Sequence, residues 1–219
     1  MTDKRDEQLV FETVSTQVDW IRDLLVEAIP GTATQVGSMV PRGYDKYVCI
    51  QHPLHSGGSQ RYPGSVDAQV MNPLMLIMSR WRDSEGEDAY YAFWSGMGLN
   101  LDETLQALTS MKTWSSETEK SSTFSVDKFR SYLLLRGSTK ALSAARDSFP
   151  DSLSPQMWWP TNKLWFFASD IDFEFSILGC NNVLGTMVLN SYDLVSIEVS
   201  LSTELSGENG NLLWPDPEN

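Results

Sequence analysis

Residues 164–177 read Leu-Trp-Phe-Phe-Ala-Ser-Asp-Ile-Asp-Phe-Glu-Phe-Ser-Ile, and this stretch decides the fold. Residues 164–169 are rich in aromatic side chains that favour strands, so they predict a strand. Residues 170–177 alternate between polar and apolar side chains, as a strand with one solvated face does. We expect this second segment to continue the first strand or to pair with it.

Further strands and helices are predicted elsewhere in the chain. Strand-forming residues dominate residues 47–51, 89–94, 129–136 and 194–201. Helical spacing, capping residues and helix-stopping residues indicate helices at 16–29, 68–81, 101–109, 138–147 and 181–189. Regular crossover helices do not separate the strands, so the sequence predicts an α+β fold. We expect a mixed or mainly antiparallel sheet of five to six strands, with four to five helices packed on it.

The composition fits one globular domain. The chain has 219 residues, of which 41% are hydrophobic and 21% are charged. Residues 150–163 contain Pro150, Pro155 and Pro160, so we expect a loop there. We expect a single domain over residues 13–201, with flexible tails at 1–12 and 202–219.

Several classes of protein are disfavoured. The longest apolar run, near residues 74–78, is far too short to span a membrane. No apolar stretch follows the charged residues at the N-terminus, so we expect no signal peptide and a cytoplasmic protein. Two cysteines cannot form a disulfide framework, which agrees with a reducing compartment.

The charge of the chain is acidic and uneven. The formal net charge is −13, and residues 164–219 hold nine acidic residues and no Lys or Arg. Nucleic acid is a poor partner for such a surface, because phosphate binding needs clustered basic residues. We expect either a solvated acidic face or a surface that attracts a basic protein partner or a cation.

The first candidate site is formed by Asp170, Asp172 and Glu174. In a strand these three carboxylates lie on one face, where they repel one another. A hard divalent cation such as Mg²⁺ or Ca²⁺ prefers oxygen ligands of this kind. The alternatives are a solvated outer face and a surface that binds a partner.

The second candidate site is formed by Cys49, His52 and His55, whose spacing resembles that of metal ligands. In a strand, however, the Cys49 side chain points away from that of His52, and Cys180 is the only other soft ligand. A buried thiol and two loop histidines therefore fit the pattern better than a zinc site. The sequence contains no nucleophile motif and no phosphate-binding loop, so we expect no cofactor.

The third candidate site is aromatic. Trp158 and Trp159 are adjacent, so on a strand they cannot face the same way. Tryptophan is common both in binding surfaces and in cores. We expect Trp165 and Trp20 to lie in the core, and both roles stay open for Trp158 and Trp159.

A resemblance accompanies these residues. The stretch from Trp158-Trp159-Pro160 through Lys163, Trp165 and Ala168 to Asp170, Asp172, Phe173 and Gly179 resembles the C-terminal signature of a family of uncharacterised actinobacterial proteins. Residues 36–44, 47–53 and 132–138 resemble earlier blocks of that family in the same order. The resemblance implies a common single-domain fold and no established activity.

This sequence also departs from the family. Lys163 stands where the family tends to carry Arg, Ile177 stands near an aromatic position, and Cys180 stands where the family has a second glycine. A lysine weakens any bidentate or stacked role for that basic residue.

Three functions are compatible with these patterns. We expect a non-enzymatic binding or regulatory protein that uses an acidic, Trp-bearing surface formed by Trp158, Trp159, Lys163, Asp170, Asp172 and Glu174. The alternative is a cation-dependent hydrolase or transferase built on Asp170, Asp172 and Glu174, with His52 or His55 as proton carrier. A third reading is a domain that binds a small molecule in an aromatic pocket.

Overall fold

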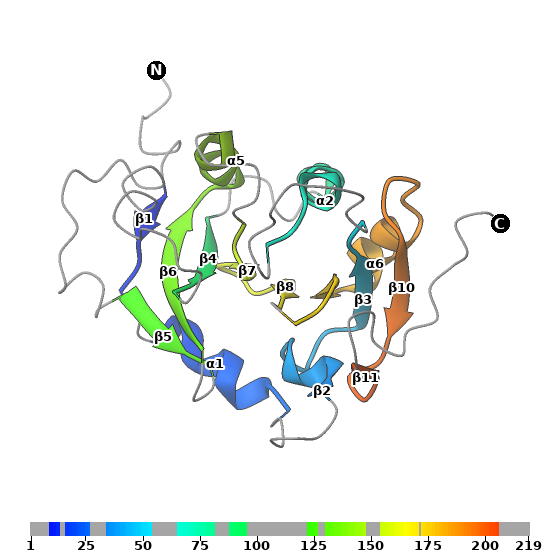
Figure 1. Cartoon of the computed structure of the whole chain (residues 1–219), viewed down its shortest axis with the longest axis horizontal. Helices are drawn as coiled ribbons and strands as arrows, with labels where there is room; N and C mark the ends of the chain where they lie inside the picture. Colours follow the sequence, from blue (N-terminus) through cyan, green and yellow to red (C-terminus); the bar gives the residue numbers. More distant parts are fainter. Residues whose placement is uncertain are drawn as a thin grey trace.

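The computed structural model describes residues 9–13, 16–26, 34–53, 65–81, 88–95, 122–126, 130–147, 154–170 and 172–205. Its centre is a nine-stranded sheet with helices on both faces (Figure 1). The strand order is β1-β6-β4-β7-β8-β9-β3-β10, and β5 also pairs with β6. The pairings are antiparallel, which confirms the α+β class and the mainly antiparallel sheet.

The elements have the following bounds. The strands of the large sheet are β1 (Val10–Phe11), β3 (Lys46–Gln51), β4 (Ala89–Trp94), β5 (Thr123–Ser125), β6 (Ser131–Gly137), β7 (Met157–Pro160), β8 (Phe166–Ser169), β9 (Phe175–Cys180) and β10 (Ser196–Val199). The helices are α1 (Thr16–Leu24), the short 3₁₀ helix η2 (Val36–Ser38), α2 (Ala68–Arg80), α5 (Thr139–Asp147) and α6 (Asn182–Leu189). A second sheet pairs β2 (Thr34–Gln35) with β11 (Glu204–Leu205).

The expected number of strands was too low. Strand β7 lies inside residues 150–163, which the prolines predicted to be a loop. Pro160 ends this strand, where its missing N–H costs no hydrogen bond within the ladder. Two further short strands, β1 and β11, lie outside residues 13–201, the range expected for the domain. The helix expected at 101–109 lies outside the described residues.

Helix α2 shows how local sequence sets an element. Asp67 caps it, because its carboxylate accepts a hydrogen bond of 2.7 Å from the backbone N–H of Gln69. Pro73 lies inside the helix, past its first turn, where it removes one backbone hydrogen bond to the carbonyl four residues earlier. None of the helices in the described ranges is long and apolar enough to cross a membrane.

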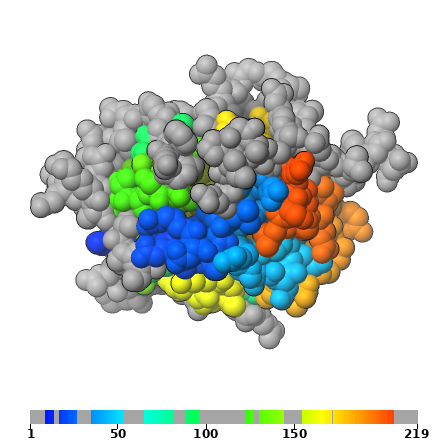
Figure 2. Space-filling model, turned by 90° about the horizontal axis from the view of Figure 1, so that it is seen from below, coloured from blue at the N-terminus to red at the C-terminus, as the bar shows by residue number. Residues whose placement is uncertain are grey.

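The sheet is covered on both faces. Helices α2, α5 and α6 lie on one face, and α1 with η2 lies on the other (Figure 1). Seen from below in Figure 2, α1 lies beside the segment that carries η2, with the C-terminal strands next to it. Backbone hydrogen bonds join these parts, from Val26 N–H to Gly37 O at 2.7 Å and from Gly37 N–H to Leu201 O at 2.9 Å.

Because both faces are covered, the central strands carry apolar side chains at almost every position. All four residues of β7 and all six residues of β9 are buried. Strands of this kind lack the alternation that marks a half-exposed strand. The consequence is that the side chains of these strands offer no open face to a ligand.

Trp158 and Trp159 lie in two separate cores, and both are 0% exposed. The Trp158 ring packs against Trp165 and Phe167 under α2, α5 and α6, with ring centroids 4.9 and 5.4 Å away. The Trp159 ring packs against Phe166 and Trp20 on the α1 side, with ring centroids 5.4 and 6.2 Å away. The expectation that these residues form a binding surface was therefore wrong.

We predict that Trp158→Ala and Trp159→Ala each lower the free energy of unfolding by about 3–5 kcal/mol, because each removes a fully buried indole. Urea denaturation followed by circular dichroism measures this loss. The control is Tyr192→Ala, which truncates a fully exposed ring and is expected to change stability by less than about 0.5 kcal/mol. Tryptophan variants as stable as this control would contradict the assignment of both indoles to the core.

Candidate functional site at the polar end of the sheet

The buried polar side chains of the described residues concentrate at one end of the sheet. Strands β3, β4 and β8 finish at this end, and β6, β7, β9 and β10 begin there. We call it the polar end. The buried polar residues there are His52, Ser65, Ser154, Gln156, Ser169 and Ser176, each at most 6% exposed. Burying a polar group costs free energy unless the group is hydrogen-bonded. We therefore expect these side chains to take part in a hydrogen-bond network or in a functional site.

Gln156 is the centre of one network. Its side-chain oxygen accepts a hydrogen bond of 2.7 Å from the backbone N–H of Trp94, and its side-chain nitrogen donates one of 3.0 Å to the backbone oxygen of Ser154. The Ser154 hydroxyl accepts a hydrogen bond of 2.7 Å from the backbone N–H of Val66. These bonds tie β4 and β7 to the start of α2, so they fix the shape of the polar end.

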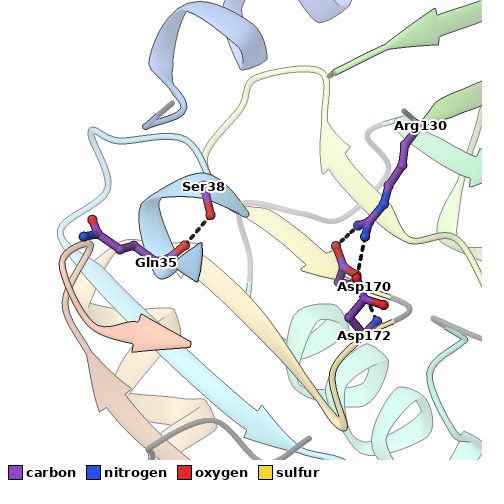
Figure 3. Close-up of polar contacts among 5 residues, drawn as sticks. All are labelled: Gln35, Ser38, Arg130, Asp170 and Asp172. Carbon is purple, nitrogen blue, oxygen red and sulfur yellow. Dashed lines mark hydrogen bonds and ion pairs between the residues drawn. The ribbon is translucent and has the colours of Figure 1, made fainter. Parts of the chain in front are cut away.

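Arg130 is the centre of a second network (Figure 3). It directly precedes β6, and its guanidinium forms ion pairs with the carboxylates of Asp170 and Asp172, the latter at 2.7 Å. The backbone N–H of Asp172 also donates a hydrogen bond of 3.0 Å to the Asp170 carboxylate. The side chain of Asp170 is only 17% exposed, whereas that of Asp172 is 65% exposed. Asp170 is therefore the buried partner of Arg130.

The pKa of Arg130 is raised above its ordinary value. Burial by itself lowers this pKa, but the charge and hydrogen bond of Asp170, together with the charges of Tyr132 and Asp172, outweigh burial. The guanidinium thus keeps its charge and compensates the two carboxylates.

Asp170, Asp172 and Glu174 do not share a strand face, so that expectation was wrong. They lie in the turn between β8 and β9, of which Ile171 is outside the described residues. The hydrogen bond from Asp172 to the Asp170 side chain stabilises the turn, as aspartate side chains commonly do. Within the described ranges, no three His, Cys, Asp or Glu side chains are placed to hold a metal ion.

His52 and Ser176 form a buried pair. His52 Nε2 lies 2.7 Å from the Ser176 hydroxyl, and the His52 backbone N–H donates a hydrogen bond of 2.8 Å to the backbone oxygen of Glu174. This spacing suits a base and a nucleophile. Ser176 is, however, 0% exposed, so its hydroxyl faces no substrate in this structure. The pair therefore ties β3 to β9.

The structure does not bring Cys49 and His52 of the candidate zinc site together. Cys49 belongs to the core on the α1 side, whereas the next residue, Ile50, belongs to the opposite core and His52 follows the strand. Burial raises the pKa of the Cys49 thiol, and burial also raises the pKa of Cys180 to about 12 despite nearby Lys46. Protonated thiols are poor metal ligands. His55 lies outside the described residues.

Lys163 lies at the opposite end of the sheet. It follows β7 in a tight turn with φ of 58°, and its Nζ lies 4.9 Å from the centroid of the Trp20 ring. The structure therefore does not bring Lys163 together with Asp170, Asp172 and Glu174. A cation over an indole face adds a modest attraction there.

Two small pockets open at the polar end, one on each face. On the α1 side, a pocket of about 60 Å³ is lined in part by Ser38, Arg130 and Asp170. On the α2 side, a pocket of about 160 Å³ is lined by Gln51, His52, Pro53, Gln69, Val70, Asp193, Leu194 and Val195. Sequence reasoning missed Arg130 in the first pocket and Gln51, Gln69 and Asp193 in the second, because no local motif marks them and each pocket joins segments that are distant in the sequence.

No family model matches this chain, and no curated protein or solved structure gives a significant match. The resemblance to the actinobacterial family therefore stays a prediction, and the site is interpreted from its own geometry.

We predict that Arg130→Ala lowers the free energy of unfolding by about 1–3 kcal/mol, because it leaves the mostly buried Asp170 carboxylate without its cation. Asp172→Ala is expected to cost less than about 1 kcal/mol, because this carboxylate is largely exposed. Urea denaturation of the single alanine variants of Arg130, Asp170 and Asp172 and of the two double variants that include Arg130 measures the coupling of Arg130 to each carboxylate. A coupling of Arg130 to Asp172 as large as that to Asp170 would contradict this ranking.

Proposed function

We propose that this chain is a non-enzymatic binding protein that takes a basic protein partner at the polar end of its sheet. The supporting observation is the charge of that end. The carboxylates there are Asp67, Asp170, Asp172, Glu174 and Asp193, and Arg130 is the one Lys or Arg among the described residues of the same end. Charge of one sign on a surface attracts and orients a partner of the other sign.

The arrangement of these acids favours a protein partner over a solvated face. Arg130 and the Asp172 backbone fix the turn that carries Asp170, Asp172 and Glu174. Gln156 and Ser154 fix the start of α2, which carries Asp67. Groups that are held in place lose little entropy when a partner binds. The polar end is thus a rigid acidic surface.

The cation-dependent enzyme receives less support. Arg130 already supplies a positive charge to Asp170 and Asp172, so a metal ion would have to displace a guanidinium. His52 is held by Ser176 in a buried pair, and His55 lies outside the described residues. No described group is therefore both free to move a proton and close to open carboxylates.

Affinity capture of the tagged protein from a lysate of its native host, at low and at moderate salt, tests this proposal. We expect a basic partner that is retained at low salt and lost as the salt approaches about 0.3 M, because surface charges are screened over less than about 10 Å at such concentrations. The triple variant Asp172→Asn, Glu174→Gln and Asp193→Asn should lose this partner while it stays folded.

The matched control is Asp19→Asn, Asp45→Asn and Glu204→Gln, which changes the net charge equally at exposed positions away from the polar end. It should retain the partner. Equal loss with both triple variants would mean that net charge matters and the polar end does not. Capture that is insensitive to both variants would overturn the proposal.

A further inference from the structure

The pocket on the α2 side of the polar end has unoccupied polar groups. Within the described part of the chain, no hydrogen bond engages the side-chain amides of Gln51 and Gln69. Asp193, which is exposed, lines the same pocket. His52, which is buried, also lines the pocket. The pocket measures about 160 Å³, whereas one water molecule needs only about 10–15 Å³. It therefore has room for a side chain.

An exposed aromatic residue is adjacent in sequence to a residue that lines this pocket. Tyr192 directly precedes Asp193 and is fully exposed, the most exposed large apolar side chain of the described residues. Val195, which lines the pocket, is 42% exposed. Exposed tyrosines of this kind are frequent anchors in binding surfaces, and their rings attract cations.

The charge of the pocket favours a cation. The N-terminus of α2, close to Gln69, would by itself attract an anion. Asp67 already occupies that end with its carboxylate and caps the Gln69 N–H. Asp193 adds a second negative charge, and among the described residues neither Lys nor Arg lines the pocket.

We propose that this pocket binds one arginine side chain of the basic partner, a proposal that rests on the function proposed above. The guanidinium donates hydrogen bonds to the amide oxygens of Gln51 and Gln69 and pairs with Asp193. Its flat face lies against the Tyr192 ring. A guanidinium suits this site better than an ammonium, because it offers five donors in a plane and stacks on aromatic rings.

The test uses N-acetyl-arginine amide as the probe and the neutral isostere N-acetyl-citrulline amide as its control. A ligand of this size is expected to bind with a Kd on the order of 1 mM. Titration of the ¹⁵N-labelled full chain should shift the amide signals of residues 51–52, 69–70 and 192–195. Citrulline amide should bind at least about tenfold more weakly, because it lacks the charge.

Variants locate the site. Asp193→Asn and Tyr192→Ala should each weaken binding of the arginine probe about three- to tenfold. Asp45→Asn, an exposed acid at the opposite end of β3, should leave it unchanged. Equal binding of both probes, shifts at other residues, or no saturation at about 10 mM would overturn the arginine pocket.

The partner capture separates this proposal from the proposed function. A captured basic partner that resists Tyr192→Ala and Asp193→Asn, with no probe binding, would refute the pocket and leave the acidic binding surface standing. Saturable probe binding at the pocket without a captured partner would support the pocket and refute the proposed function.

Discussion

The structure depends on the placement of two adjacent tryptophans in two cores. Trp158 and Trp159 lie on β7, in the middle of the sheet, and each ring fills the core of its own face. Such a strand is stable only where both faces are covered, because either indole would otherwise lie in water. The helices on one face and α1 with η2 on the other are thus required by this one dipeptide.

Two-sided burial also decides where function can lie. The faces of the central strands are closed, so ligands can reach the sheet at its ends or edges. One end carries the buried polar network around Gln156, the ion pairs of Arg130 and the larger described pocket. Side-chain contacts of Arg130 and Asp170 hold the acidic turn, and those of Gln156 and Ser154 hold the start of α2.

Much of the fold could be predicted from local sequence, and the site could not. Helix α2 follows from its Asp67 cap, and β4 from its run of strand formers. Strand β7 was missed, because its prolines indicate a loop and its burial comes from distant elements. The 170–174 turn was mistaken for a strand, because the same alternation of acids fits both. The pairing of Arg130 with Asp170 spans 40 residues and carries no local signal.

If the proposed function is right, binding takes place at the polar end and leaves the helix-covered faces of the sheet free. Hydrogen–deuterium exchange of the full chain, with and without a deca-arginine peptide, tests it most directly. We expect slower exchange in residues 51–52, 172–175 and 192–195, with unchanged exchange in α1 and α5. Protection confined to the outer faces of α1 or α5, or no protection at the polar end, would contradict it.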